Sequence, residues 1–484
     1  MPADDDPAPS TRTRRRRSDA ALNHATILDS ARLLLADDGD ASVAAIADHA
    51  GLGRGTVHRH FATREDLITA VRRQARDDAE SDEEDHLRPP GELAAIAPAP
   101  LSVADVLNKV APFQLGEQIV AEAQRVPGVS SAALYVVDLD GSTMQRLAGP
   151  ATFPDRVTVP LAVGPEIPRE GVAALRAVFA ELLPAAVVAP LHLRGRAIGV
   201  LLAVGSVDDA VHDLAREAAV ALALAPRYTD YVDTMRRTRP TSPAAEIQQN
   251  LLPPRIARIA GAGLAGNVLP GYEIGGDWFD YAENHEGAWI GIADSAGTGP
   301  RAAGIGAVSL GAFRATRRGT TDPAKVLRAM HDVLLELGDE RATATATVGV
   351  WNAPAATFRW VSSGEQSPIR VGADGALEVL ADGALPDIGS GAFPHGAIEV
   401  HACRLAPGER LLFLSDGILD RRGADDEGFG LRGVEAATRK APDQSAPATL
   451  RAIEDAVREL SPEALEDDAT LVVLAAGGMA GRRE

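Results

Sequence analysis

The sequence is poor in cysteine, because Cys403 is the only one among 484 residues. A single cysteine excludes an intramolecular disulfide framework and is typical of proteins that fold in a reducing cytoplasm. Long apolar runs are also missing: the longest, residues 197–205 and 218–226, are about half of what a bilayer span needs. The arginines near the N-terminus are followed by polar residues, so we expect no export signal. These absences predict a cytoplasmic protein with no membrane partner.

An excess of positive charge is missing as well. The chain carries 48 basic and 68 acidic side chains, for a formal net charge of −20, which on average argues against nucleic acid as a partner. Residues 12–76, however, hold twelve arginines against eight acids, a local charge of about +4, and seven acids follow within residues 77–85. The charge therefore leaves nucleic-acid binding open at one end of the chain.

The length predicts roughly three domains at about 150 residues each. The hydrophobic share of 45% and the charged share of 24% are those of ordinary globular domains. Composition and hydrophobic periodicity predict a disordered tail (1–11), an all-α unit (12–80), an acidic and proline-rich linker (81–100), a mixed α/β domain (101–227), a helical connector (228–252), a strand-rich α+β domain (253–477) and a second tail (478–484).

The first helical unit contains a glycine turn, Gly51-Leu52-Gly53, and a capping box at residues 63–66. On pattern alone it is equally a small helical bundle. Residues 46–61, read with residues 64–67, closely resemble a TetR-type helix-turn-helix. The resemblance implies that the recognition helix runs over residues 54–60. The residues it places toward DNA are Arg54, Gly55, Thr56, His58, Arg59 and His60.

Two further expectations follow for this unit. The basic residues 12–17 suit contacts to phosphates or the minor groove, although a solvated tail is the alternative. TetR-type regulators dimerise through an all-helical effector domain, and residues 101–227 do not have that pattern. We therefore expect a homodimer whose contacts come from elsewhere in the chain; the alternative is weak DNA binding.

The middle domain has strand patterns at residues 132–137, 186–193 and 197–204, a turn signal at Asp138-Leu139-Asp140-Gly141, and a closing helix over residues 211–224. Residues 134–138 and 189–201, together with this alanine-rich closing helix, resemble a GAF sensory domain. The resemblance implies a small-molecule ligand, and a ligand-free dimerising spacer is the alternative. Because no cysteine lies here, a covalently attached tetrapyrrole is excluded.

The last domain places an aspartate in four places where a strand pattern meets a turn: residues 275–280, 292–299, 414–417 and 466–470. Any one Asp-Gly pair is explained by turn formation alone. The order of these segments, together with residues 249–253, 302–303, 313–314, 406–410 and 429–430, resembles the SpoIIE-type branch of the metal-dependent protein phosphatases (PPM, phosphatase 2C-like). This resemblance implies a four-layer αββα fold.

The same resemblance implies which residues form the active site. The catalytic and metal-binding carboxylates would be Asp277, Asp294, Asp416 and Asp467, and the carbonyl oxygen of Ser295 would be a further ligand. The cofactors would be two divalent cations, Mn²⁺ or Mg²⁺, which prefer oxygen ligands. Phosphate monoesters are among the slowest biological bonds to hydrolyse, and a pair of cations activates water and neutralises phosphoryl charge.

The sequence departs from the family pattern in two places. Thr298 stands where the family has the histidine of Gly-His-Gly, and Glu365 stands where it has the histidine of Ala-Gly-His-Pro. Neither position is among the implied ligands.

The sequence therefore predicts a multidomain protein with an all-α helix-turn-helix head, an α/β GAF-like domain and an α+β phosphatase domain. The function it favours is a serine/threonine protein phosphatase of a bacterial signalling pathway. Its expected substrate is a phosphorylated anti-sigma-factor antagonist, with control by the GAF-like domain and coupling to the DNA-binding head. The alternative is a TetR-type transcription regulator whose phosphatase-like domain is a non-catalytic scaffold.

Overall fold

The computed structural model describes residues 26–28, 30–31, 34, 42–61, 63–71, 103–159, 162–205, 209–273, 275–364, 366–380, 385–423, 426–461, 463–465 and 467–477. The chain divides into two compact units between Pro100 and Leu101, and each is considered by itself. The two expected tails, the basic residues 12–17, the acidic residues 77–85, the linker and Glu365 lie outside the described residues.

The head unit contains two complete short helices, α2 (Val43–His49) and α3 (Arg54–His60). Helix α2 begins at Ser42, whose Oγ accepts a hydrogen bond from the amide of Ala45. Gly51, at φ +65°, makes the turn between the helices. The small core that holds them consists of Ile27, Leu28, Ala31, Ile46, Ala47, Val57, Phe61 and Leu67.

The expected capping box is present at the start of the next helical segment. The amide of Asp66 donates to Thr63 Oγ1 at 3.1 Å, and the amide of Thr63 donates to Asp66 Oδ2 at 3.0 Å. Two amides that have no partner within a helix are thereby satisfied.

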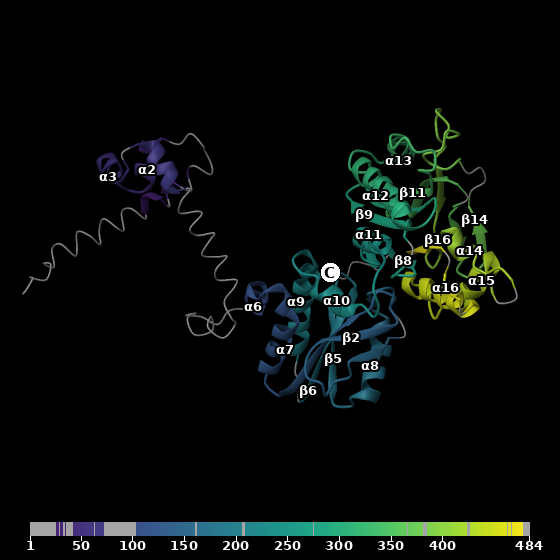
Figure 1. Ribbon diagram of the computed structural model, residues 1–484, viewed down its shortest axis with the longest axis horizontal. Helices are drawn as coiled ribbons and strands as arrows, with labels where there is room; N and C mark the ends of the chain where they lie inside the picture. The colour runs from purple at the N-terminus through teal and green to yellow at the C-terminus, as the bar shows by residue number, and fades with distance from the viewer. Residues whose placement is uncertain are drawn as a thin grey trace, which may run out of the picture. The chain divides into compact units, whose positions relative to one another are not determined.

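The middle domain is an antiparallel sheet with helices on both faces (Figure 1). Its elements are α6 (Val103–Lys109), η1 (Pro112–Gln114), α7 (Leu115–Arg125), β1 (Val129–Val137), β2 (Thr143–Ala148), β3 (Arg156–Thr158), β4 (Ile167–Pro168), α8 (Gly171–Leu182), β5 (Ala186–Leu193), β6 (Arg196–Gly205) and α9 (Ala210–Leu224). The strand order is β3-β2-β1-β6-β4, and β5 also pairs with β6.

The two faces of this sheet follow from strand alternation. Leu134 on β1 packs with α6, α7 and α9, whereas its neighbour Tyr135 packs with α8. Tyr135 meets the ring of Phe179 edge to face at 5.7 Å and donates its hydroxyl hydrogen to the carbonyl of Pro154. Large side chains therefore fill the space between the sheet and α8.

The connector consists of η2 (Ala225–Arg227), α10 (Tyr231–Arg236) and α11 (Pro243–Leu251). Helix α11 packs against α12 (Gly299–Thr316), the first long helix of the last domain. Among the described residues no helix is both long and apolar enough to cross a bilayer.

The last domain consists of two stacked antiparallel sheets, each covered by helices on its outer face (Figure 1). The first sheet has the order β15 (His401–Arg404), β12 (Thr357–Ser363), β11 (Ala344–Asn352), β10 (Gly287–Ser295) and β9 (Trp278–Asn284). The second has the order β14 (Leu377–Val379), β13 (Ile369–Val371), β16 (Arg410–Leu414), β17 (Ala469–Ala476), β8 (Ala262–Leu269) and β7 (Ile256–Ile259).

Large apolar side chains, among them Phe279, Trp360 and Phe413, fill the layer between the two sheets. Helices α12 (Gly299–Thr316) and α13 (Pro323–Leu335) cover the first sheet, and α15 (Gly430–Lys440) and α16 (Ala446–Leu460) cover the second. The four-layer αββα architecture expected from the sequence is confirmed.

Most of the expected elements are present, and the differences have local causes. The β-type run at residues 398–405, which predicts a strand of that length, forms only the short strand His401–Arg404. The sequence patterns did not predict strands β3, β4, β7, β8, β9, β13 and β14 or helices α8, α14 (Asp416–Leu419) and α15. Strand β8 contains two glycines that weaken its β pattern, and one of them, Gly266, leaves room for the ring of Phe279, which a Cβ would overlap.

Candidate metal centre and helix-turn-helix

The four candidate aspartates lie where strands of the two sheets end. Asp277 directly precedes β9 and Asp294 is the second-last residue of β10, and the register pairs their neighbours Trp278 and Ala293. In the second sheet Asp416 opens the short helix α14 (Asp416–Leu419) after β16, and Asp467 lies just before β17. The two aspartates of each sheet therefore lie at adjacent ends of neighbouring strands.

A fifth acid, Asp468, links the strand ends of the first sheet to those of the second. Its Oδ2 accepts a hydrogen bond from the amide of Asp277 at 3.1 Å, and Thr470 Oγ1 donates to Asp277 Oδ2 at 2.5 Å. Ser415 Oγ donates to the carbonyl of Asp468 and accepts from the amide of Thr470. A Cβ added at Gly417 would overlap the carbonyl oxygen of Asp468, so the turn after β16 needs glycine here.

The electrostatics show that these carboxylates act on one another. Burial, followed by the charges of Asp294 and Asp468, raises the pKa of Asp277 well above its usual range. Burial and the nearby charge of Asp416 raise the pKa of Asp294 to about 8. Burial also raises the pKa of Asp467, and it raises that of Asp468 to about 7. Such a cluster of mutually repelling acids is stabilised when cations bind to it.

The chemistry of the donor set fits a pair of hard divalent cations. All the candidate donors are oxygens, and three buried oxygens at the site have no hydrogen-bond partner among the described residues: Asp468 Oδ1, Ser295 Oγ and Gln248 Oε1. Within the described part of the chain, however, no three His, Cys, Asp or Glu side chains converge into a finished metal-binding group. The aspartate side chains are therefore close to one another, and they would have to move closer together to coordinate cations.

Gln248 on α11 also reaches this site, and the sequence did not single it out. Its Nε2 donates to the carbonyl of Asp277 at 3.0 Å and to Asp468 Oδ2 at 2.7 Å, and its side chain is buried. A polar residue four positions after the buried Ala244 lies on the apolar face of α11, and this was the signal available in the sequence. Asp468 was visible only as the second member of an Asp-Asp pair.

A buried ion pair fixes the end of α11 beside the site. Asp280 Oδ2 accepts from Arg314 Nε at 2.8 Å and from Arg317 Nη1 at 2.7 Å. Arg314 Nη2 in turn donates to the carbonyl of Leu251, the last residue of α11. Asp280 therefore ties β9, α11 and α12 together.

The departure from the family pattern at Thr298 lies at the start of α12. Gly297 and Gly299 both have positive φ, at +91° and +74°, which explains the glycines on either side. Thr298 is exposed and stands at the N-cap position without a side-chain capping bond. It contributes no hydrogen bond to the described aspartate cluster.

In the head, the candidate DNA-contacting residues lie on or around one exposed face of α3. Arg54, Gly55, His58 and Arg59 are exposed, and Val57 faces the core. Arg59 folds back along its own helix, because its Nε donates to the carbonyl of Gly55 and its Nη2 to Thr56 Oγ1. Thr56 and His60 are half-buried at the edges of this face.

Comparison with known families defines two domains of the chain. Residues 284–476 match the family of stage II sporulation protein E (SpoIIE), and residues 27–71 match the bacterial regulatory proteins of the TetR family. The chain therefore combines a SpoIIE-type phosphatase domain of the PPM class with a TetR-type helix-turn-helix. The GAF-like identity of the middle domain stays a prediction.

Individual relatives match only parts of the chain. The HTH-type transcriptional repressor LfrR of Mycolicibacterium smegmatis is 49% identical over 51 residues, which are 10% of this chain and 27% of that protein. The chain thus spans about a quarter of the length of this relative. The SiaA-PP2C domain of Pseudomonas aeruginosa is 23% identical with a TM-score of 0.41, and the match covers 48% of this chain and 94% of that one. For the phosphatase domain and regulatory fragment of SpoIIE from Bacillus subtilis, the identity is 13%, the TM-score 0.39 and the coverage 85% and 99%.

Proposed function

We propose that the C-terminal domain hydrolyses phosphoserine or phosphothreonine on a partner protein with the help of two divalent cations, Mn²⁺ or Mg²⁺. The observation that carries this proposal is that Asp277, Asp294, Asp416 and Asp467 lie where strands of the two sheets end and interact around Asp294, in a SpoIIE-type domain. Carboxylates with pKa values raised by burial and by one another are a mark of functional sites.

Each part of the site has an assigned role in this proposal. The four carboxylates and the carbonyl oxygen of Ser295 would hold the cations, which supply an activated water and neutralise phosphoryl charge when bound. Asp468 and Gln248 hold the backbone of Asp277 from both sides, through its amide and its carbonyl. They therefore keep the first aspartate in place without having to be ligands.

The substrate and the regulation complete the proposal. A phosphorylated anti-sigma-factor antagonist is the substrate that the SpoIIE-type resemblance favours, in a cytoplasmic signalling pathway. The middle domain would act as a GAF-like sensor with a small-molecule ligand, and it contacts the phosphatase domain directly, since Glu166 Oε2 accepts from the amide of Ile256. The head would bind DNA through α3.

We further propose that two copies of the chain form a homodimer. The head carries one recognition helix, and helix-turn-helix proteins read paired half-sites as dimers. Apolar side chains that a partner would cover line the outer face of α9 and the residues after it: Val220 is 51% exposed, Leu224 54% and Tyr228 79%. The four-residue spacing places Val220 and Leu224 on one side of α9.

The test is phosphate release from phosphoserine- and phosphothreonine-containing proteins by the full chain, with Mn²⁺ and with a chelator. We expect turnover that requires the cation and that is absent with a phosphotyrosine substrate. DNA binding without any cation-dependent turnover would instead identify the scaffold alternative, in which the phosphatase-like domain is non-catalytic.

A further inference from the structure

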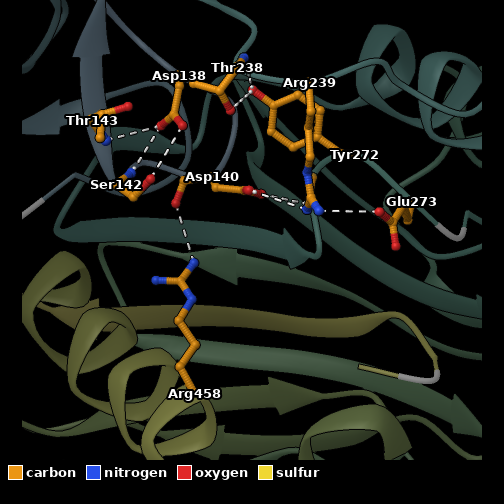
Figure 2. A network of polar contacts seen from close by, with 10 residues as sticks. Asp138, Asp140, Ser142, Thr143, Thr238, Arg239, Tyr272, Glu273 and Arg458 are labelled. Carbon is orange, nitrogen blue, oxygen red and sulfur yellow. Dashed lines mark hydrogen bonds and ion pairs between the residues drawn. The ribbon is translucent and has the colours of Figure 1, made fainter. Parts of the chain in front are cut away.

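The tip of the β1–β2 hairpin of the middle domain contacts the phosphatase domain at the loop that follows β8 (Figure 2). Asp140 Oδ1 accepts a hydrogen bond from the amide of Gly271 at 3.0 Å, and its Oδ2 lies 3.6 Å from Arg239 Nη2. The carbonyl of Asp140 accepts from Arg458 Nη2 on α16 at 3.3 Å. One residue of the middle domain thus meets the connector, a loop and a helix of the phosphatase domain.

The hairpin tip is held rigidly to its own sheet. Asp138, only 1% exposed, accepts from the amides of Ser142 at 2.9 Å and Thr143 at 3.3 Å through its Oδ1. Gly141 has φ +68° and packs so closely on Gly164 that a Cβ would collide with its backbone. Because the tip has little freedom of its own, a displacement of β1 and β2 would be carried to Asp140.

The loop that Asp140 contacts leads directly to the first candidate ligand. It begins after β8, and Gly271 lies six residues before Asp277. The connector also forms hydrogen bonds with this loop. The hydroxyl oxygen of the buried Tyr272 accepts from the amide of Thr238 at 3.0 Å, and the backbone carbonyl of Tyr272 accepts from the amide of Ser242. At the far end, a Cβ on Gly275 would collide with Ala244 of α11.

The contact of Asp140 differs in kind from the contact that Glu166 makes with the phosphatase domain. Glu166 is buried, pairs with Arg196 at 2.8 Å, and accepts a hydrogen bond from the amide of Ile256 at the start of β7. The side chain of Asp140 is 26% exposed and that of Arg239 is 46% exposed. Partly exposed ion pairs are weak, so this contact is one that a modest movement of the hairpin would break.

We propose that Asp140 is a positioning residue for the candidate metal centre. By binding the amide of Gly271 and facing Arg239, it holds the loop that carries Asp277, so that a movement of the middle-domain sheet changes the affinity of the phosphatase domain for divalent cations. This inference rests on the proposed role of the aspartates as cation ligands. It adds a physical link by which the middle domain would control the reaction.

The experiment compares the full chain with Asp140→Ala, Asp140→Asn and Glu273→Ala. Glu273 is the matched control, because it pairs with the same Arg239 from the same loop, at 3.2 Å, without touching the middle domain. Two quantities are measured without substrate: Mn²⁺ affinity, from the spin-resonance signal of the free ion, and hydrogen exchange of the peptide that spans residues 270–277.

For Asp140→Ala we expect about tenfold weaker Mn²⁺ binding and faster exchange of the loop, since one hydrogen bond to a charged acceptor is lost. Asp140→Asn keeps an acceptor for the Gly271 amide and should recover most of the affinity. Glu273→Ala should match the wild type in both quantities.

The proposal is overturned if Asp140→Ala leaves Mn²⁺ affinity and loop exchange unchanged, even when its unfolding temperature falls, because Asp140 would then only hold the domains together. It is also overturned if Glu273→Ala produces the same loss. An Asp294→Asn variant separates this failure from that of the proposed function: if it binds Mn²⁺ as the wild type does, the aspartates are not the ligands.

Discussion

Replacing Glu166 by glutamine should loosen the contact between the middle domain and the phosphatase domain strongly. Glu166 is 7% exposed, lies 2.8 Å from Arg196 Nε and accepts from the amide of Ile256 at 2.9 Å. Arg255, 5% exposed, lies against the same carboxylate. Burial raises the pKa of Glu166, and the charges of Arg196 and Arg255 oppose that rise.

The size of the effect follows from what the substitution leaves behind. Glutamine keeps the shape and an acceptor for Ile256, but it leaves two buried guanidinium groups without their counter-charge. Removing one partner of a buried ion pair costs about 3–5 kcal/mol. Arg255 keeps its bonds to Gln249 and to the carbonyl of Pro253, so we expect a loss of about 2–4 kcal/mol, somewhat below the full penalty.

Hydrogen exchange of a peptide covering β7 measures this loss locally. At about 1.4 kcal/mol per factor of ten, exchange should become about 30- to 700-fold faster in Glu166→Gln. Glu170→Gln is the control, because Glu170 lies on the same segment and is exposed; it should change exchange less than about twofold. Wild-type exchange in a folded Glu166→Gln protein would refute the inference that this ion pair holds the interface.

Three further predictions concern the head, the dimer and the core. Arg54→Ala should weaken DNA binding by the full chain and lower the salt dependence of log affinity by about one, measured by titration at several salt concentrations; an unchanged slope would contradict the phosphate contact. Leu224→Glu should convert the proposed homodimer to monomers in light scattering, whereas a persisting dimer would place the interface elsewhere. His331 is buried, accepts from the amide of Gly389 and stacks on Phe393 at 4.2 Å, and burial lowers its pKa. Since the native state then disfavours the charged form, stability should fall as pH drops below about 6.5; His331→Gln should lack that part of the slope in thermal unfolding between pH 7.5 and 5.5, and an identical slope would contradict it.

Elements with a strong periodic pattern could be predicted from the sequence. The apolar run at residues 197–204 is strand β6 (Arg196–Gly205), and the closing helix predicted over residues 211–224 is α9 (Ala210–Leu224). In these segments the spacing of apolar residues along the chain shows which faces of the element are buried. The β8 segment lacked such a signal, because two glycines interrupt it, and one of them, Gly266, leaves room for Phe279 of the other sheet.

The candidate site was predictable where its residues recur beside turns. Asp277, Asp294, Asp416 and Asp467 each mark the end of a strand, so their order along the chain was informative. The role of Gln248 at the site could not be predicted in this way, because its bond to Asp468 spans 220 positions in the sequence. The contact of Asp140 with Gly271 spans 131 positions. Such roles depend on how domains pack, which no local pattern records.

The central claim is that the aspartate cluster holds the cations that drive phosphate hydrolysis. The measurement that tests it most directly is Mn²⁺-dependent phosphate release from a generic phosphomonoester by the wild type, Asp294→Ala and Asp416→Ala. An exposed acid of the same domain, changed in Asp332→Ala, is the control. We predict turnover in the wild type and the control, and its loss in both cluster variants. Equal rates in all four proteins would contradict the two-cation account.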